Sequence, residues 1–95
     1  MDKEMKTDFL KNNKINLVIS KEVSEIMEER FILLEDIEKV VTNSILMGER
    51  FFNSEDSSYL ANLRVKNVTY WVQYVENEDG IHIINVYSHR MEIVR

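Results

Sequence analysis

The stretch "NVTYWVQY" at residues 67–74 decides how the second half of the chain folds. It surrounds Trp71, the only tryptophan, with two tyrosines, two valines and a threonine. Side chains of these types favour strands, because they pack well on a pleated surface. Neighbouring residues in a strand point to opposite faces. We therefore expect an apolar face formed by Val68, Tyr70, Val72 and Tyr74, and a mixed face formed by Thr69, Trp71 and Gln73.

The stretches on either side of this strand show a similar alternation. Downstream, "IHIINVYSHRMEI" at 81–93 is rich in β-branched residues. The dipeptide "KN" at 66–67 predicts a tight turn, and "ENEDG" at 76–80 predicts another, in which Gly80 is free to adopt a positive φ. Three strands joined by short turns are typical of an antiparallel meander. Upstream, "YLANLRV" at 59–65 places these residues on one face: Tyr59, Ala61, Leu63 and Val65.

Apolar residues recur at helical spacing in the first half of the chain. Ser20 is suited to the start of a helix, because its hydroxyl can accept a hydrogen bond from an unpaired backbone N–H. A second helix is predicted from about Leu34 to Gly48, since glycine commonly ends helices. The run "FILL" at 31–34 fits no single helix face and favours a break near 30–33. One continuous helix over 20–48 is the alternative.

These patterns predict an α+β fold in which two N-terminal helices pack on one face of a three-stranded antiparallel meander. The run "INLVIS" at 15–20 is either the lead-in to the first helix or contains an extra short edge strand at 15–19. The polar run "NSEDSS" at 53–58 is interpreted as the connection from the helices to the sheet. Residues 14–95 form one predicted domain, whereas the polar residues 1–13 are expected to be frayed or disordered.

Composition excludes several classes of function. The 95 residues contain no cysteine, so neither a disulfide nor a thiolate site is available. Residues 1–56 carry eight Lys or Arg against thirteen Asp or Glu, and residues 57–95 carry four of each. Neither half supplies the basic face that phosphate binding needs, which disfavours nucleic acid as a partner. No export signal or long apolar run is present, so we expect a cytoplasmic protein without membrane contact.

The mixed face of the sheet holds the candidate contact residues. Trp71 is either a contact for a partner on an exposed face or a core residue under a loop. Arg90 is either an anion clamp, with Arg64 beside it, or one half of an ion pair with Glu92. His89 shares a face with Tyr87 and is either a titrating group or a hydrogen-bonded structural residue. The predicted contact set is therefore Arg64, Trp71, Tyr87, His89 and Arg90.

Catalytic, metal and cofactor sites are not predicted. His82 and His89 are seven residues apart on one strand, so strict alternation places them on opposite faces. Ser88 and His89 point apart for the same reason, which removes the one candidate nucleophile–base pair. The chain has no glycine-rich phosphate loop. We therefore expect no cofactor and favour a protein that is not an enzyme.

The segment "NVTYWVQYVENEDGIHIINVYSHRMEI" at 67–93 resembles a small domain of unknown function. That domain has a threonine-tyrosine-tryptophan-valine strand, an acidic-glycine turn and a closing tyrosine-serine-histidine-arginine-methionine segment. The run "ISKEVSEIMEERFILLEDIEKVV" at 19–41 is similar to its helical half, so the resemblance covers about residues 15–94. The family occurs alone or attached to pyridine-nucleotide-disulfide and glutamate-synthase-type oxidoreductases of anaerobic prokaryotes.

The resemblance implies association with a flavoprotein or iron–sulfur oxidoreductase, without catalysis by this domain. The favoured function is therefore an interaction or accessory module for such an enzyme. One alternative is a small toxin-type ribonuclease using Arg64, Tyr87, His89 and Arg90, although the acidic balance disfavours RNA. The other is a self-associating structural domain, because the open edges of a short meander invite a homodimer.

Overall fold

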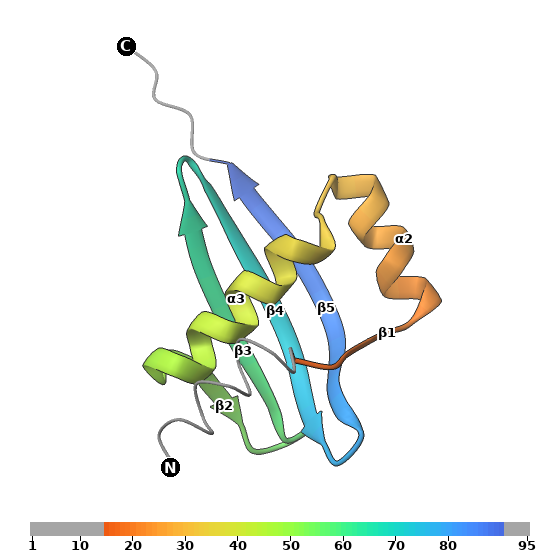
Figure 1. Ribbon diagram of the computed structural model, residues 1–95, viewed down its shortest axis with the longest axis vertical. Coiled ribbons are helices and arrows are strands. Elements are labelled where there is room, and N and C mark those ends of the chain that lie inside the picture. Colours follow the sequence, from red (N-terminus) through yellow and green to blue (C-terminus); the bar gives the residue numbers. More distant parts are fainter. Residues whose placement is uncertain (1–14, 91–95) are drawn as a thin grey trace.

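The computed structural model describes residues 15–90. The region predicted to be disordered, 1–13, lies outside these residues, as does the end of the predicted third strand at 91–93. Two helices and five strands follow one another along the chain (Figure 1): β1 (Leu17–Ile19), α2 (Lys21–Arg30), α3 (Leu34–Met47), β2 (Phe51–Asn53), β3 (Ser58–Val65), β4 (Val68–Asn77) and β5 (Gly80–Arg90).

The prediction of a three-stranded antiparallel meander is wrong. The sheet has five strands in the order β1-β5-β4-β3-β2. The predicted strands form its centre, and one short strand is added at each edge. β1 pairs with β5 in parallel, whereas every other neighbouring pair is antiparallel, so the sheet is mixed. The apolar and mixed faces predicted for β3 and β4 agree with the pairing of the two strands.

The parallel edge strand β1 is the extra strand that the sequence left open at 15–19. It pairs Leu17 with Ile81 and Ile19 with Ile83 across more than sixty residues of chain. Asn16 fixes this contact, because its backbone O accepts a hydrogen bond from Ile81 N at 2.8 Å and its side chain donates to Asp79 O at 2.6 Å. A pairing of such long range leaves no local pattern in a three-residue strand.

The other edge strand, β2, was missed because it is short. Its three residues, Phe51–Asn53, pair with Ser58–Leu60. The polar run that we interpreted as a helix-to-sheet connection is instead the turn of a hairpin between β2 and β3. Asp56 shapes this turn by accepting hydrogen bonds from both the backbone N and the hydroxyl of Ser58, at 3.1 and 2.7 Å. Three residues are too few for alternation to be recognised.

Residues 20–48 form two helices, with both ends where the sequence predicts them. Ser20 Oγ accepts a hydrogen bond from Val23 N at 3.2 Å and caps α2. Gly48, with a φ of 69°, ends α3. Between the helices Phe31 adopts a left-handed φ of 57°, which turns Ile32 into the core at 4% exposure. Burial of Ile32 therefore requires the break.

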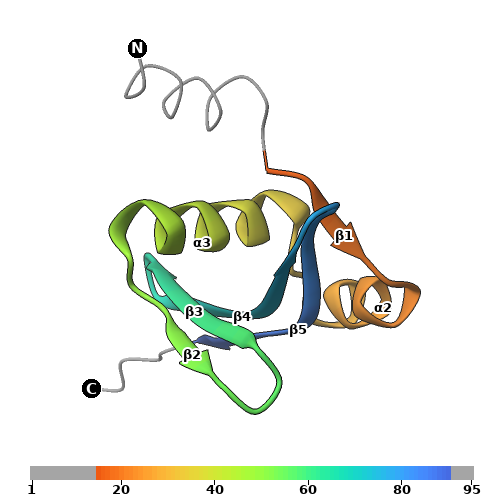
Figure 2. The same ribbon diagram turned by 90° about the horizontal axis from the view of Figure 1, so that it is seen from below.

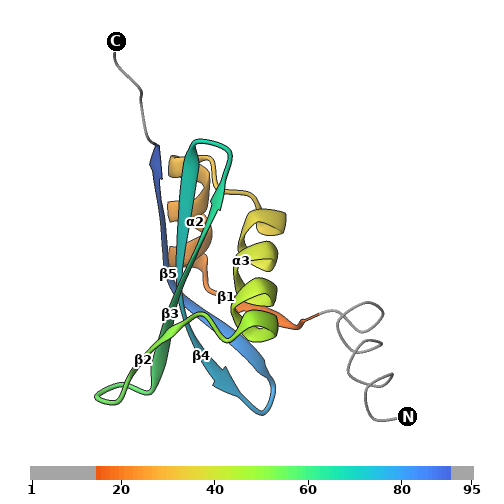
Figure 3. The same cartoon turned by 90° about the vertical axis from the view of Figure 1, so that its left-hand side faces the viewer.

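The prediction that both helices pack on one face of the meander is also wrong. α3 packs over β3 and β4 (Figures 1 and 2). α2 packs along β5, at the edge of the sheet where β1 is the last strand. Figure 3 shows the sheet edge-on, with α3 as a separate layer on one side of it. The core between these elements is formed by Val23, Ile32, Ile37, Val40, Val41, Ala61, Val72, Tyr74, Ile83 and Val86.

Tyr74 ties α3 to the centre of the sheet. Its side chain is fully buried, and its hydroxyl lies 2.7 Å from Ser44 Oγ in α3. Arg50, between α3 and β2, donates to the same hydroxyl at 3.0 Å and to Glu76 Oε2 at 2.7 Å. The Arg50 guanidinium also lies 3.8 Å from the ring centre of Tyr59. Among residues 15–90, no buried side-chain nitrogen or oxygen lacks a hydrogen-bond partner.

Gly80 is required where β1 meets β5. Its φ is 144°, and a Cβ added there would lie 2.6 Å from Asn16 O. We expect Gly80→Ala to lower the free energy of unfolding by about 2 kcal/mol or more, because it strains the backbone and separates β1 from β5. Urea denaturation measures this loss. Gly48→Ala is the matched control: its Cβ would meet no atom within 4 Å, so only the left-handed φ costs energy, about 1 kcal/mol.

The hydroxyl of Tyr74 provides a second test of the core. Tyr74→Phe keeps the ring but removes the hydrogen bonds to Ser44 and Arg50, which should cost about 1 kcal/mol of stability. Ser44 keeps its bond to Val41 O at 2.7 Å, so the loss stays modest. Tyr70→Phe, at a half-buried tyrosine of the same strand, serves as the control. Equal thermal stability of the two variants would contradict the linking role of the Tyr74 hydroxyl.

Candidate functional site

The sheet face turned away from α3, which we call the open face, presents three adjacent rows of side chains. Each row runs across the strands, because directly paired residues point to the same side. Among residues 15–90, no helix covers this face. The rows are Phe51–Leu60–Gln73–Asn85, Asn62–Trp71–Tyr87 and Arg64–Thr69–His89.

The first row is apolar at one end and carries amides at the other. Phe51 is 68% exposed, although it lies on a strand, and Leu60 lies beside it on β3. Gln73 donates a hydrogen bond to Ser58 Oγ at 3.1 Å, and Asn85 Oδ1 accepts one from Val86 N at 3.0 Å. These bonds hold both amide side chains in place beside the exposed phenylalanine.

The second row carries an aromatic pair. The rings of Trp71 and Tyr87 are stacked, with their centres 5.9 Å apart and their planes 8° from parallel. Trp71 is half-buried, so it is neither a core residue nor a fully exposed one. Stacking holds the two rings in one orientation, which reduces the entropy that a contact with a partner would cost.

The third row carries the only basic side chains of the three, Arg64 and His89. Arg64 and His89 lie on either side of Thr69, so two strand spacings, about 10 Å, separate them. The Arg64 side chain is engaged locally, because its Nε donates to Lys66 O at 2.8 Å. Arg90 pairs with Val68 and therefore belongs to the opposite face of the sheet. The structure thus brings together four of the five predicted contact residues and separates Arg90 from them.

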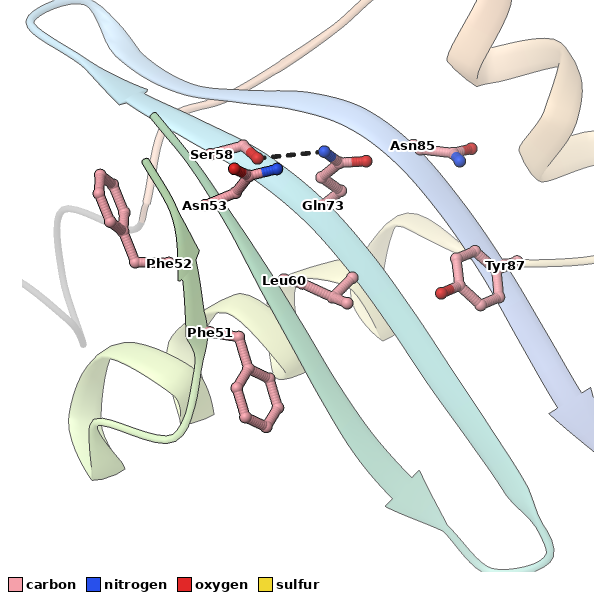
Figure 4. Close-up of a pocket in the computed structure, with 8 residues that line it drawn as sticks. All are labelled: Phe51, Phe52, Asn53, Ser58, Leu60, Gln73, Asn85 and Tyr87. Carbon is pink, nitrogen blue, oxygen red and sulfur yellow. Dashed lines mark hydrogen bonds between the residues drawn. The ribbon is translucent and has the colours of Figure 1, made fainter. Parts of the chain in front are cut away.

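A shallow hollow of about 310 Å³ lies over the first row (Figure 4). Phe51 and Tyr87 stand at opposite sides of it, with Leu60 and Gln73 between them (Figure 4). Its walls are aromatic, and its polar groups are neutral amides and hydroxyls. Such a surface suits apolar contacts with a few hydrogen bonds, as the centre of a protein interface requires. It offers no charge that could hold a phosphate.

A bulge in β5 changes which residues share this face. Tyr74 pairs with Ile83 but Gln73 pairs with Asn85, so Ile84 is an extra residue. Ile84 and Asn85 are both exposed, between the buried Ile83 and Val86. The bulge reverses the alternation, and His82 and His89 consequently lie on the same face. Our prediction that they lie on opposite faces is wrong, although six residues of strand, about 20 Å, still separate them.

Two pairs of titratable groups lie outside the three rows, His82 with Asp79 and Arg50 with Glu76. His82 Nε2 lies 2.8 Å from Asp79 Oδ1 in the turn, and this hydrogen bond holds the pKa of Asp79 below its ordinary value. Burial of Arg50 opposes its charge, but the bonds to Tyr74 and Glu76 outweigh that effect and hold its pKa above the ordinary value. Within residues 15–90, no three His, Asp or Glu side chains are grouped to hold a metal ion.

Comparison with protein-family models, curated proteins and solved structures finds no match to the chain. The relationship to an oxidoreductase-associated domain therefore stays a prediction. In the part of the chain that the structure describes, no helix has the length and apolar character needed to cross a membrane.

Sequence reasoning placed Gln73 on the open face but missed Phe51 and Asn85 of the first row. Phe51 escaped because β2 was not recognised. Asn85 lies on the face of Tyr87 by simple alternation, but it was not considered as a contact residue. One signal of the bulge in β5 was available: adjacent isoleucines at 83 and 84 break the alternation of the strand. Such a break is typical of a bulge.

The emission of Trp71, the only tryptophan, reports on the aromatic pair. Tyr87→Ala removes the stacked ring and admits water to the indole, so we expect a red shift of several nanometres with little loss of stability. Phe31→Ala, at a residue 86% exposed far from the pair in sequence, should leave the spectrum unchanged. An unshifted spectrum for Tyr87→Ala would contradict the stacked arrangement.

Proposed function

We propose that this protein is a non-catalytic interaction module whose open face docks on another protein in the cytoplasm. The observation that carries the proposal is the aromatic set formed by Phe51, Trp71 and Tyr87 on a sheet face that no helix among residues 15–90 covers. Aromatic side chains are enriched at the energetic centres of protein interfaces. Neutral amides beside them allow hydrogen bonds without the desolvation cost of a buried charge.

The three rows also define the surface that a partner must present. Their composition changes from aromatic and amide groups to Arg64 and His89 at one end, and no carboxylate belongs to them. A complementary partner presents an apolar patch with carboxylates next to it. The abundant Glu of α2 and α3 lies outside these rows, so it does not repel such a partner.

The partner class that we propose is a flavoprotein or iron–sulfur oxidoreductase. The support for this class is the resemblance of residues 67–93 to a domain found alone or attached to such enzymes. An accessory domain of that kind needs no catalytic group of its own. It needs a docking surface, and the open face supplies one.

The test is capture of the partner from native extract by the immobilised chain, followed by its identification and purification. We expect an oxidoreductase with a flavin or an iron–sulfur cluster. Phe51→Ala and Tyr87→Ala should each weaken its binding about tenfold or more, as loss of a central aromatic contact does. Isothermal titration with the purified partner measures the change in Kd.

Phe31→Ala is the matched control, because Phe31 is a more exposed phenylalanine at the break between α2 and α3. It should change the Kd by less than twofold. Recovery of only chaperones or RNA-associated proteins would contradict the oxidoreductase partner. Binding that is lost with Phe31→Ala but kept with Phe51→Ala would contradict the choice of the open face.

A further inference from the structure

The two edges of the sheet are protected very differently. At the β5 edge, β1 pairs with Ile81–Ile83 and α2 packs along β5, so strand and helix together cover it. At the β3 edge, β2 begins only at Phe51, after α3, and it pairs with Ser58–Leu60 alone. The part of β3 at 61–65 has β4 on one side and no neighbouring strand among residues 15–90 on the other (Figure 1).

The backbone groups of this open edge can be assigned. Val65 and Val68 flank a two-residue turn. In such a turn the carbonyl of the residue before it, here Val65, points to the strand that follows. Backbone groups in an antiparallel strand alternate between its two sides. The N–H and C=O groups of Val65, Leu63 and Ala61 therefore face β4. Those of Asn62 and Arg64 point outward from the sheet.

We propose that a second copy of this chain pairs with residues 61–65, its β3 antiparallel to the first across a two-fold axis at Leu63. The two five-strand sheets then form one continuous ten-strand sheet. Asn62 of each copy exchanges backbone hydrogen bonds with Arg64 of the other. The edge is five residues long on both copies, so neither leaves an unpaired remainder.

This register follows from which groups face outward and from charge. An axis at Asn62 would set Leu60 opposite Arg64, but Leu60 already pairs with Phe51 of β2. An axis at Arg64 would place two arginines directly opposite each other, which is unfavourable. Only the axis at Leu63 uses both outward-facing residues of each copy without either conflict.

The side chains of this arrangement are complementary. On the helix side, Leu63 meets Leu63, and Ala61 meets Val65. On the open face, Arg64 lies opposite Asn62, a neutral acceptor. A hollow beside Leu63 is lined by α3 residues of both signs, Glu38 and Lys39 among them. The lining is not of a single sign, because Lys39 offsets one of its two glutamates, Glu35 and Glu38. This self-complementarity favours a second copy over an unrelated strand.

The proposal does not rest on the proposed function. Pairing at the β3 edge leaves Phe51, Trp71 and Tyr87 uncovered, so both open faces stay free on one side of the joined sheet. Phe51→Ala and Tyr87→Ala should weaken partner binding and leave self-association unchanged. Each idea can therefore fail without the other.

Two opposite changes at one position test the register by sedimentation. Asn62→Asp places a carboxylate opposite Arg64 twice per dimer and should tighten the dimer about twofold to thirtyfold. Asn62→Lys places two cations there and should weaken it by a similar factor. A wild-type chain that stays monomeric up to about 1 mM overturns the proposal, as do shifts of the same sign for both variants.

A cross-link tests the position of the axis, since the chain contains no cysteine. Leu63→Cys places two thiols opposite each other within the Cα separation that a disulfide accepts, about 4.5–5.5 Å. Mild oxidation should convert most of it to a covalent dimer. Asn62→Cys faces residue 64 of the second copy, so it should cross-link several-fold less. Equal cross-linking of the two variants contradicts the axis. If Leu63→Cys fails to fold, sedimentation of Asn62→Asp and Asn62→Lys still tests the register.

Discussion

The hydrogen bond between the buried hydroxyls of Tyr74 and Ser44 joins α3 to the centre of the sheet. A tyrosine placed in a core must pair its hydroxyl, because an unpaired buried polar group costs about 1–3 kcal/mol. Ser44 of α3 and Arg50 supply the partners, and both lie on one side of β4. This pairing helps to hold α3 over β3 and β4. The apolar side chains of the two strands determine which sheet face is buried and which face stays open.

Local pattern was sufficient for the parts of the fold that local forces determine. The caps at Ser20 and Gly48, the break at Ile32, and the three long strands could be predicted, because each follows from burial or hydrogen bonding within a few residues. The faces of β3 and β4 followed from alternation in the same way. For the candidate site, Arg64, Trp71, Tyr87 and His89 could be placed together on this basis.

Contacts between distant segments decided the rest. β1 exists as a strand because Asn16 and Gly80 fit closely, across more than sixty residues. β2 is three residues long and is defined by its pairing with β3. The bulge at Ile84 changes the face of every residue before it in β5, which is why His82 was misplaced. Arg90 was grouped with His89 as a contact residue, although alternation alone places these neighbours on opposite faces.

The two helices cover one edge and one face of the sheet, and this leaves the two surfaces at which we propose contacts, the open face and the end of β3. α2 is used to cover the β5 edge, and α3 is used to bury one face, so the chain has no described element left for the open face or for the end of β3. A face and an edge bind differently: the face through aromatic side chains, the edge through backbone groups. Because Phe51 and Tyr87 point away from the plane in which β3 would pair, a contact at one surface does not block the other. The geometry of this sheet therefore keeps the proposed face contact and the proposed edge contact apart.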